Sequence, residues 1–463
     1  MNASFTTITS SDIMKKCKLS PIGTILLTSI AYLSLLSGSH STAISSETVL
    51  GDYKSDGSFE GFGFKSLCLL FVSFAGSNFF IPPILKKVGP VFMIVSASIL
   101  SLPYMVAMIH PIAWILYISS FLSGMANSML WNSIVFYINE WSNPANVNKH
   151  FSVFFGIVQS NFIVGGLVMY LVLAKVETID RETRMKIFIP FTVLAVFGVI
   201  LSIFLPRNTV QEIELKLDDS ENVKLTNSDS DPENVLRENK AKSFCSNIFM
   251  IFRQLKHMIA WKIIGIGLFT GMMMSFYVGI FGTCIGHMRR LAEYPKPIIG
   301  LSTILIGVGG IVASFIDIAS KRVGKIFLMT VVEVLSVTTI ILCFLVFPDD
   351  VNYQKSEKAG IIPPNVHVVL LIAFFVGFID VFWNIQISSL MKKVLKEEQI
   401  GSVISLYKLS QSLTAACCAL FGEMYNFHVF LLIFGIFSLT SYVIAVHTEY
   451  TRKRGDRNAP SLD

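Results

Sequence analysis

Apolar runs of about 20 residues recur along the chain between residues 21 and 447, and charged or turn-forming residues separate them. A helix of that length crosses the hydrocarbon core of a bilayer. Twelve spans are predicted, at residues 21–42, 62–84, 90–109, 112–139, 151–174, 186–206, 260–286, 295–318, 323–347, 365–391, 400–422 and 425–447. The expected fold class is therefore an all-α membrane protein with twelve transmembrane helices.

The composition excludes an ordinary soluble domain. Hydrophobic residues make up 53% of the chain and charged residues only 15%, whereas soluble domains carry about 25% charged residues. The net charge of +6 is not concentrated in a basic block interleaved with aromatic residues, so no nucleic-acid partner is predicted. The lipid bilayer is the expected partner.

Patterns that carry enzyme or metal chemistry are missing from the sequence. The chain has no HExxH, GxSxG or paired-carboxylate motif, and its seven cysteines show neither CxxC nor zinc-ligand spacing. The glycine-rich run at residues 307–310 has no phosphate-loop context and indicates close helix packing instead. We expect no enzyme activity, no catalytic residue, no metal and no cofactor.

Basic residues gather in the short turns on one predicted side of the membrane. They are Lys15, Lys16, Lys18, Lys86, Lys87, Lys321, Arg322, Lys325, Lys392, Lys393, Lys396 and the tail "TRKRGDR". The positive-inside bias predicts that both termini are cytoplasmic, while plasma membrane and endomembrane both remain open. The first span could instead be a secretory signal, because lysines precede it and "SGSHSTA" follows its apolar core. We predict a retained helix there, since the repeat described below requires one.

One long polar segment divides the chain. Residues 208–243 are rich in Asp, Glu, Asn and Ser and poor in aromatic residues, which predicts a disordered linker. The following stretch, "FCSNIFMIFRQLKHM", has apolar residues at helical spacing and is expected to lie along the membrane surface. The predicted organisation is an N-terminal six-helix bundle at 1–206, a cytoplasmic linker with an interfacial helix at 207–258, and a C-terminal six-helix bundle with a basic tail at 259–463.

The two predicted bundles share an internal repeat. The turn "KKVGPVFM" is matched 235 residues later by "KRVGKIFLM". Trp131-Asn132 and Gln159 are separated by the same 28 residues (159 − 131) as Trp383-Asn384 and Gln411 (411 − 383). Two pseudo-symmetric six-helix bundles of this kind form the architecture of major facilitator transporters.

The same segments resemble one branch of that superfamily. "FLSGMANSMLWNSIVFYI" with "HFSVFFGIVQSN", and "FFVGFIDVFWNIQISSLM" with "ISLYKLSQSLTAA", are similar to the Unc-ninety-three branch, whose members include ion channel regulatory proteins. The matching residues are Gly377, Asp380, Asn384, Gln386, Lys408, Gln411 and Ser412. The resemblance covers most of the apolar chain and is weak in the first span, the outer loops and the linker.

The turns between the second and third spans of each half depart from the superfamily pattern. That pattern places an Asp beside a basic residue and Gly-Arg, where it supports an inner gate. The first turn has Lys86, Lys87 and Gly89 but no Asp. The second turn has Lys321, Arg322 and Gly324, but its Asp, Asp317, lies four residues before the first of them and not beside them. An inner gate of the usual kind is therefore in doubt.

A carboxylate interrupts the tenth predicted span. Asp380 precedes Val394, at the predicted turn, by fourteen residues, and Lys408 follows it by fourteen (394 − 380; 408 − 394). In an antiparallel hairpin both would lie at similar depth, where they could neutralise each other. Asn384 at i+4 and Gln411 at i+3 give each charge an amide on its own helix face. A pair that fixes helix packing and a site that binds a solute both fit this pattern.

The candidate cavity residues come from both halves: Asp380, Asn384, Gln386, Lys408, Gln411, Asn132 and Gln159. Glu333, in the ninth span, is expected to serve helix packing instead. Two functions are open. The chain could be a transporter that carries an ion or a small polar solute through a midplane site. Alternatively, it could be a non-transporting accessory subunit that regulates or traffics another membrane protein, such as a potassium channel.

Overall fold

The computed structural model describes residues 20–55, 63–143, 146–174, 176, 179–207, 252–292, 295–319, 324–395, 397–422 and 425–458, which are almost entirely helical. The helices are α2 (Pro21–Ser55), α3 (Gly63–Ser77), α4 (Ile81–Val88), α5 (Pro90–Ala107), α6 (Ala113–Glu140), α7 (Val147–Val158), α8 (Ser160–Leu173), α9 (Arg181–Ile203), η1 (Gln254–Lys256), α12 (Met258–Ser275), the π-helix η2 (Phe276–Ile280), α13 (Phe281–His287), α14 (Lys296–Ala319), α15 (Lys325–Val346), α16 (Val366–Val394), α17 (Glu397–Phe421) and α18 (Phe427–Asn458). Most of the polar linker, at 208–251, lies outside the described residues.

Ten helical stretches in the described part of the chain are long and apolar enough to cross a membrane. Two of them are continuous across an interruption, since α7 and α8 form one and α12, η2 and α13 form another. The other two predicted spans correspond to α6, which is rich in Ser and Asn, and to α3 followed by α4. Every predicted span thus coincides with helix. By length and composition alone, however, ten helical stretches of the described residues qualify as membrane spans, whereas twelve were predicted.

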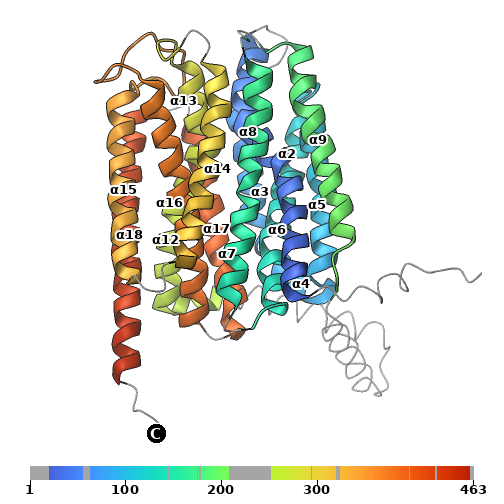
Figure 1. The fold of residues 1–463 in the computed structure, drawn as a ribbon, viewed down its shortest axis with the longest axis vertical. Helices are drawn as coiled ribbons and strands as arrows, with labels where there is room; N and C mark the ends of the chain where they lie inside the picture. The colour runs from blue at the N-terminus through green and yellow to red at the C-terminus, as the bar shows by residue number, and fades with distance from the viewer. Residues whose placement is uncertain are drawn as a thin grey trace, which may run out of the picture.

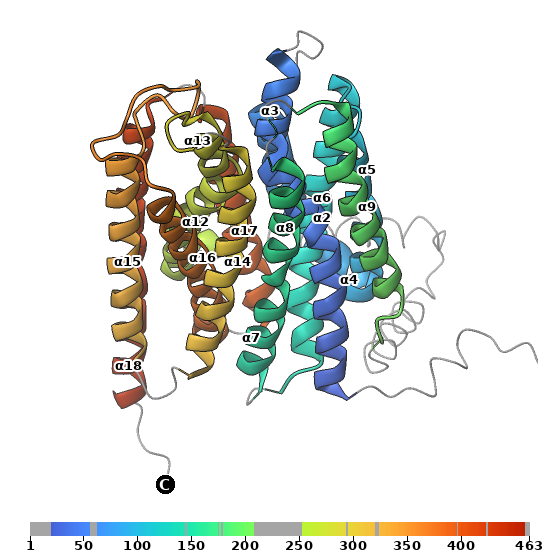
Figure 2. The ribbon, with the colours of Figure 1, turned by 45° about the horizontal axis from the view of Figure 1, so that its top comes forward.

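The helices form two groups that stand side by side (Figure 1). Helices α2 to α9 make up one group and α12 to α18 the other, and the view in Figure 2 keeps them separate. The groups meet along two seams, where α8 and α7 pack on α14 and where α3 packs on α17. Helix α2 begins and α18 ends at the lower end of Figure 1. This is the major facilitator arrangement that the repeat predicts.

Glycines allow the first seam to be close. A Cβ atom added to Gly166 of α8 would lie 2.6 Å from the carbonyl oxygen of Gly300, and one added to Gly300 of α14 would lie 2.7 Å from that of Gly166. Further along α14, Gly309 faces the backbone of Phe374 in α16. The glycine-rich run therefore lies where α14 packs between two neighbours. Small residues serve this purpose in membrane helices because they let backbones approach.

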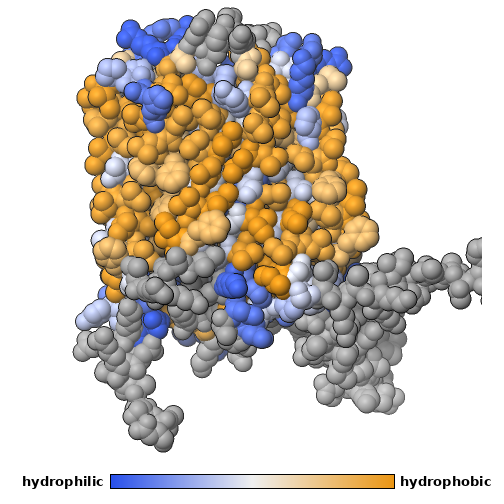
Figure 3. Space-filling view, viewed as in Figure 1, coloured by the Kyte–Doolittle hydropathy of each residue, from blue (hydrophilic) through white to orange (hydrophobic). Residues whose placement is uncertain are grey.

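On the face shown in Figure 3 the middle of the molecule is mainly apolar, crossed by one paler streak, and polar side chains gather towards both ends. Leu432 and Val443 of α18 and Val334 of α15 are each at least 60% exposed. Such exposure suits contact with lipid tails. Glu333 of α15 is buried, and its carboxylate accepts hydrogen bonds from the Ser438 hydroxyl of α18 at 3.0 and 3.1 Å. This contact is consistent with the packing role expected for Glu333.

The turns expected to form an inner gate differ in the two halves. Gly89 ends α4 with φ +80° and donates its N–H to the Leu85 carbonyl, a conformation that favours glycine. Gly324 precedes α15 with an ordinary φ of −63°. Lys87 is exposed, whereas Lys321, Arg322 and the side chains of Lys86 and Asp317 lie outside what the structure describes. The sequence repeat at these turns therefore does not extend to their backbone conformation.

The loop between α15 and α16 closes the upper end of the second group. Asp350 is buried there and accepts hydrogen bonds from Ser356 at 2.8 Å and Gln354 at 3.0 Å. Its carboxylate also lies 3.0 Å from the Lys358 ammonium. Burial by itself raises the pKa of Asp350, but the hydrogen bonds from Lys358, Ser356 and Gln354 outweigh it and hold the pKa below its usual value.

Candidate functional site

A cavity of about 470 Å³ lies between the two groups of helices. Residues of α6 and α7 line one side of it, and residues of α16 and α17 line the other. It extends to the lower end of the bundle, since Ser142 in the α6–α7 loop and Gly401 near the start of α17 are part of its wall. Deep inside the bundle, the cavity wall includes the rings of Phe162 and Tyr277, one from each group of helices. These rings meet edge to face, with their centroids 5.9 Å apart.

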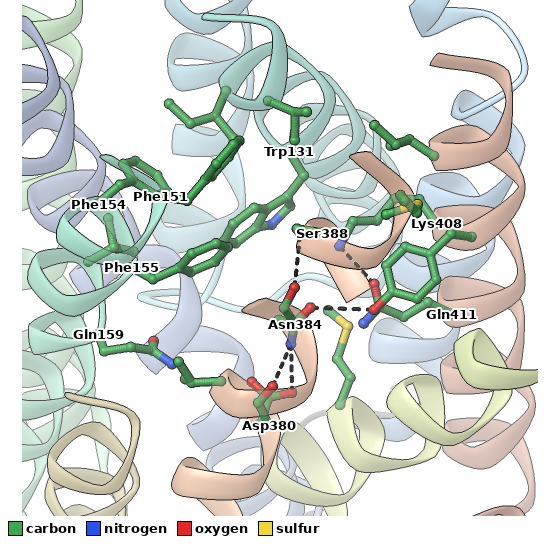
Figure 4. A pocket seen from close by; sticks show the side chains of 18 of the residues that line it. Trp131, Phe151, Phe154, Phe155, Gln159, Asp380, Asn384, Ser388, Lys408 and Gln411 are labelled. Atoms are coloured by element: carbon green, nitrogen blue, oxygen red, sulfur yellow. Dashed lines mark hydrogen bonds between the residues drawn. The ribbon is translucent and has the colours of Figure 1, made fainter. Parts of the chain in front are cut away.

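Helix α16 brings Asp380 and Asn384 to this cavity (Figure 4). The Asn384 amide donates to the Asp380 carboxylate at 3.2 Å and to the Asp380 backbone carbonyl at 2.9 Å. The Asn384 side-chain oxygen accepts a longer hydrogen bond of 3.4 Å from the Tyr407 hydroxyl. The i+4 spacing thus supplies the amide partner expected for the carboxylate.

Helix α17 brings Lys408 to the same cavity. The Lys408 ammonium donates to the Gln411 side-chain oxygen at 2.9 Å, as the i+3 spacing predicts. It also lies 5.1 Å from the ring centre of Tyr407 and 5.5 Å from that of Trp131, which belongs to the other group of helices. Aromatic faces attract an ammonium at this distance. Lys408 therefore reaches across the cavity to the other group of helices.

Asp380 and Lys408 do not form the direct pair that the hairpin suggests. None of the ion pairs among the described residues joins them within 4 Å, and each is held by an amide of its own helix. The reason is that the two helices of the hairpin diverge: α16 packs mainly on α14, whereas α17 packs on α12 and α3. The similar depth that the hairpin predicts therefore does not imply contact, and both side chains line the cavity.

The wall opposite these charges is aromatic, and we call it the aromatic wall: Trp131, Phe151, Phe154 and Phe155. The rings of Trp131 and Phe155 lie nearly parallel, 14° apart, with centroids at 6.3 Å. Gln159, between α7 and α8, adds an amide to the same side (Figure 4). This half supplies no acid or base to match Asp380 and Lys408 at the equivalent positions, which are Ser128 and Gly156.

Two of the seven predicted cavity residues lie elsewhere. Asn132 is 1% exposed and donates to the Asn78 side-chain oxygen at 2.8 Å, inside its own group of helices. Gln386 is 3% exposed and is not part of the cavity wall. Successive helix positions are turned by about 100°, so the neighbour of a cavity residue often faces away from the cavity. The other five predicted residues line it.

His40 and Tyr277 line the cavity and were not predicted to do so. His40, on α2, stacks on Phe162 with centroids 5.5 Å apart, and its Nδ1 atom has no hydrogen-bond partner in the described structure. Its sequence context, "SGSHSTA", was interpreted only as the end of a span or of a signal. A lone histidine at the centre of a helix 35 residues long was the signal that could have identified it.

The described residues contain no group of three or more His, Cys, Asp or Glu side chains that could hold a metal ion. Comparison with known sequences then places the chain in a family. The family model described as "Ion channel regulatory protein UNC-93" matches residues 59–446. The chain belongs to the UNC-93 family.

One relative of this UNC-93 family member matches nearly the whole chain, and another matches about a quarter of it. It is 26% identical over 432 residues to "UNC93-like protein MFSD11" of Xenopus tropicalis, covering 90% of this chain and 94% of the relative. It is 29% identical over 141 residues to "Protein unc-93 homolog A" of Mus musculus, covering 27% of this chain and 31% of the relative.

Solved structures share the fold. The peptide transporter POT in complex with sulfate superposes with a TM-score of 0.59 at 13% identity, covering 94% of this chain and 95% of that one. A POT family transporter in complex with 5-aminolevulinic acid gives a TM-score of 0.59 at 11% identity, covering 94% of this chain and 96% of that one. At such identities the similarity establishes the major facilitator fold and says nothing of substrate.

Proposed function

We propose that this UNC-93 family member is a transmembrane transporter that moves a small polar solute through the cavity between its two halves. The observation that carries the proposal is that Asp380 and Lys408 both face this cavity without forming an ion pair with each other. Intramembrane charges are costly, and those that line a cavity mark solute or ion pathways by default. A pair that served packing alone would be expected to be in direct contact.

The shape of the molecule supports alternating access. The cavity reaches the lower end of the bundle, whereas towards the upper end α8 and α14 approach closely at Gly166 and Gly300. If the positive-inside prediction holds, the lower end is cytoplasmic and the cavity faces the cytoplasm. Opening of this glycine seam with closure of the lower end would expose the same residues to the other side.

An accessory role is the second candidate. It is favoured by the family's description as ion channel regulatory proteins and by the missing Asp in the turn that holds Lys86, Lys87 and Gly89. The solved structures of similar fold are described as transporters, which favours the first candidate. An accessory subunit would not need charged side chains directed into a cavity of about 470 Å³. The two candidates therefore differ in whether Asp380 matters to solute movement.

Vesicle uptake separates the two candidates. Proteoliposomes that contain the wild-type chain, Asp380→Asn or Glu333→Gln would be incubated with a defined mixture of amino acids, amines, organic acids and inorganic ions. Their contents would then be measured by mass spectrometry. We expect at least one solute to accumulate with the wild type and with Glu333→Gln, whose carboxylate lies outside the cavity, and at least about tenfold less with Asp380→Asn. Equal contents in all three preparations and in empty vesicles would overturn the proposal.

A further inference from the structure

Asp380 and Lys408 line the cavity together with Glu140 of α6, and both have capacity left for a ligand. An ammonium has three N–H donors, and for Lys408 the described structure has one acceptor, Gln411. A carboxylate can accept about four hydrogen bonds, and Asp380 receives one, from Asn384. A partner that met both groups would satisfy donors and acceptors that the protein itself leaves open.

The space between the charges is bridged by polar and aromatic groups. Asn384 contacts Asp380 on one side and the Tyr407 hydroxyl on the other, and the Tyr407 ring lies next to Lys408. The acid and the base are therefore linked along the cavity wall through Asn384 and Tyr407. Because neither charge neutralises the other by contact, a ligand with one charge would leave the opposite protein charge unmatched.

The aromatic wall faces this surface from the other half. Trp131 and Phe155 present nearly parallel rings, and Phe151 and Phe154 extend the wall. The cavity volume of about 470 Å³ lies within the range of about 300–1,000 Å³ that holds small molecules. The cavity thus has an acid, a base and an apolar face in one enclosure.

We propose that the ligand of this cavity is a small zwitterion with an apolar group, of the chemical class of an apolar amino acid. Its ammonium binds the Asp380 carboxylate, its carboxylate binds the Lys408 ammonium, and its apolar group lies against the aromatic wall. This inference rests on the proposed transport function and names its substrate class. It differs from a site for a simple cation or anion because both charges are required at once.

Three probes with the same ring and chain length test the class directly. They are phenylalanine, phenethylamine, which lacks the carboxylate, and 3-phenylpropanoate, which lacks the ammonium. Thermal unfolding of the purified full chain in detergent would be followed across a concentration series of each probe, since a ligand of the folded state raises the unfolding temperature. We expect phenylalanine to bind at least about tenfold more tightly than either single-charge probe.

Single variants should change selectivity in opposite directions. Asp380→Asn should remove the advantage of phenylalanine over 3-phenylpropanoate, and Lys408→Gln should remove its advantage over phenethylamine. Glu333→Gln is the matched control and should keep the wild-type order of affinities. A purely structural role for either charge would weaken all three probes alike and would not reorder them.

The outcomes separate this inference from the proposed function. If a single-charge probe binds the wild type as tightly as phenylalanine, or if none of the three binds, the zwitterion is overturned. Uptake of another solute class in the vesicle assay would then leave transport intact. If the three probes bind with the predicted order of affinities but wild-type vesicles accumulate no solute, the proposed zwitterion site is supported and the proposed transport function is overturned.

Discussion

Helices α6 and α16 occupy equivalent positions in the two halves, 252 residues apart (383 − 131), but they turn different faces to the cavity. In α6, Trp131 lines the cavity and Asn132 is buried in its own half. In α16 the roles are reversed, because Asn384 lines the cavity and Trp383 is 1% exposed against Phe269.

The reversal shows that the two halves repeat the same residue types, while helix packing determines which of these side chains face the cavity. Helix α16 is held by α14 through the close approaches at Gly309 and Gly377, whereas α6 packs on α5 and α3. A rotation of about one residue step separates the two outcomes. At this repeated Trp-Asn pair one half therefore offers a ring to the cavity and the other offers an amide, although the two sequences look alike at these positions.

The largest expected effect separates the two repeated tryptophans. Trp383→Ala removes a fully buried ring and should lower the free energy of unfolding in detergent by about 3–5 kcal/mol. Trp131→Ala should cost clearly less stability, because its ring lines the cavity, but it should weaken phenylalanine binding. Chemical unfolding of both variants with binding measured in parallel is the check. Equal losses of stability would contradict the assigned difference between the halves.

A smaller effect is expected at the seam that joins the halves. Gly166→Ala places a Cβ atom against the Gly300 carbonyl and should destabilise the folded chain by about 1–3 kcal/mol through overpacking. Gly156→Ala is the matched control, because its Cβ would lie at an ordinary 3.6 Å from Ser314 of the same helix α14. The measurement is the shift in unfolding temperature of each variant. A control as unstable as Gly166→Ala would mean that the seam is not the limiting contact.

The two repeated asparagines should also behave differently. Asn132→Ala leaves the buried Asn78 side-chain oxygen without its donor, which should cost about 1–3 kcal/mol of stability and little solute binding. Asn384→Ala should cost less than about 1 kcal/mol, since water in the cavity can replace the amide, but it should impair binding at Asp380. Unfolding and probe-binding curves for the two variants would be compared. The comparison fails if Asn132→Ala is the variant that loses binding.

The smallest effect is expected in the loop at the upper end of the second half. Asp350→Asn should lower stability at pH 7 by on the order of 1 kcal/mol, because the carboxylate accepts hydrogen bonds there. Because its pKa in the folded chain lies below the usual value, this contribution is present at neutral pH and is lost as the pH falls through the folded-state pKa. The difference in unfolding temperature between wild type and variant should therefore shrink below about pH 4. A difference that grows on acidification would contradict the assignment.

Hydropathy and spacing predicted the positions of the helices along the chain, because the bilayer imposes a length that can be read from the sequence. The amide partners of Asp380 and Lys408 could also be predicted, since i+3 and i+4 neighbours share a helix face. The separation of these two charges could not be predicted from the sequence, because it depends on which helices pack against α16 and α17. For the same reason the burial of Asn132 and the cavity position of His40 were missed, since the rotation of a helix about its axis is set by packing and hydropathy does not record it.

The helical interruptions on the cavity wall have a mechanical consequence. Gln159 separates α7 from α8 in one half, and the π-helix at Phe276–Ile280 separates α12 from α13 in the other. Each joint carries a cavity residue, Gln159 or Tyr277. The regular ladder of backbone hydrogen bonds is already interrupted there, so bending at these points breaks fewer of them than bending elsewhere. The segments α8 and α13 can therefore pivot about points that lie on the cavity wall. A molecule bound in the cavity would contact these pivot points directly.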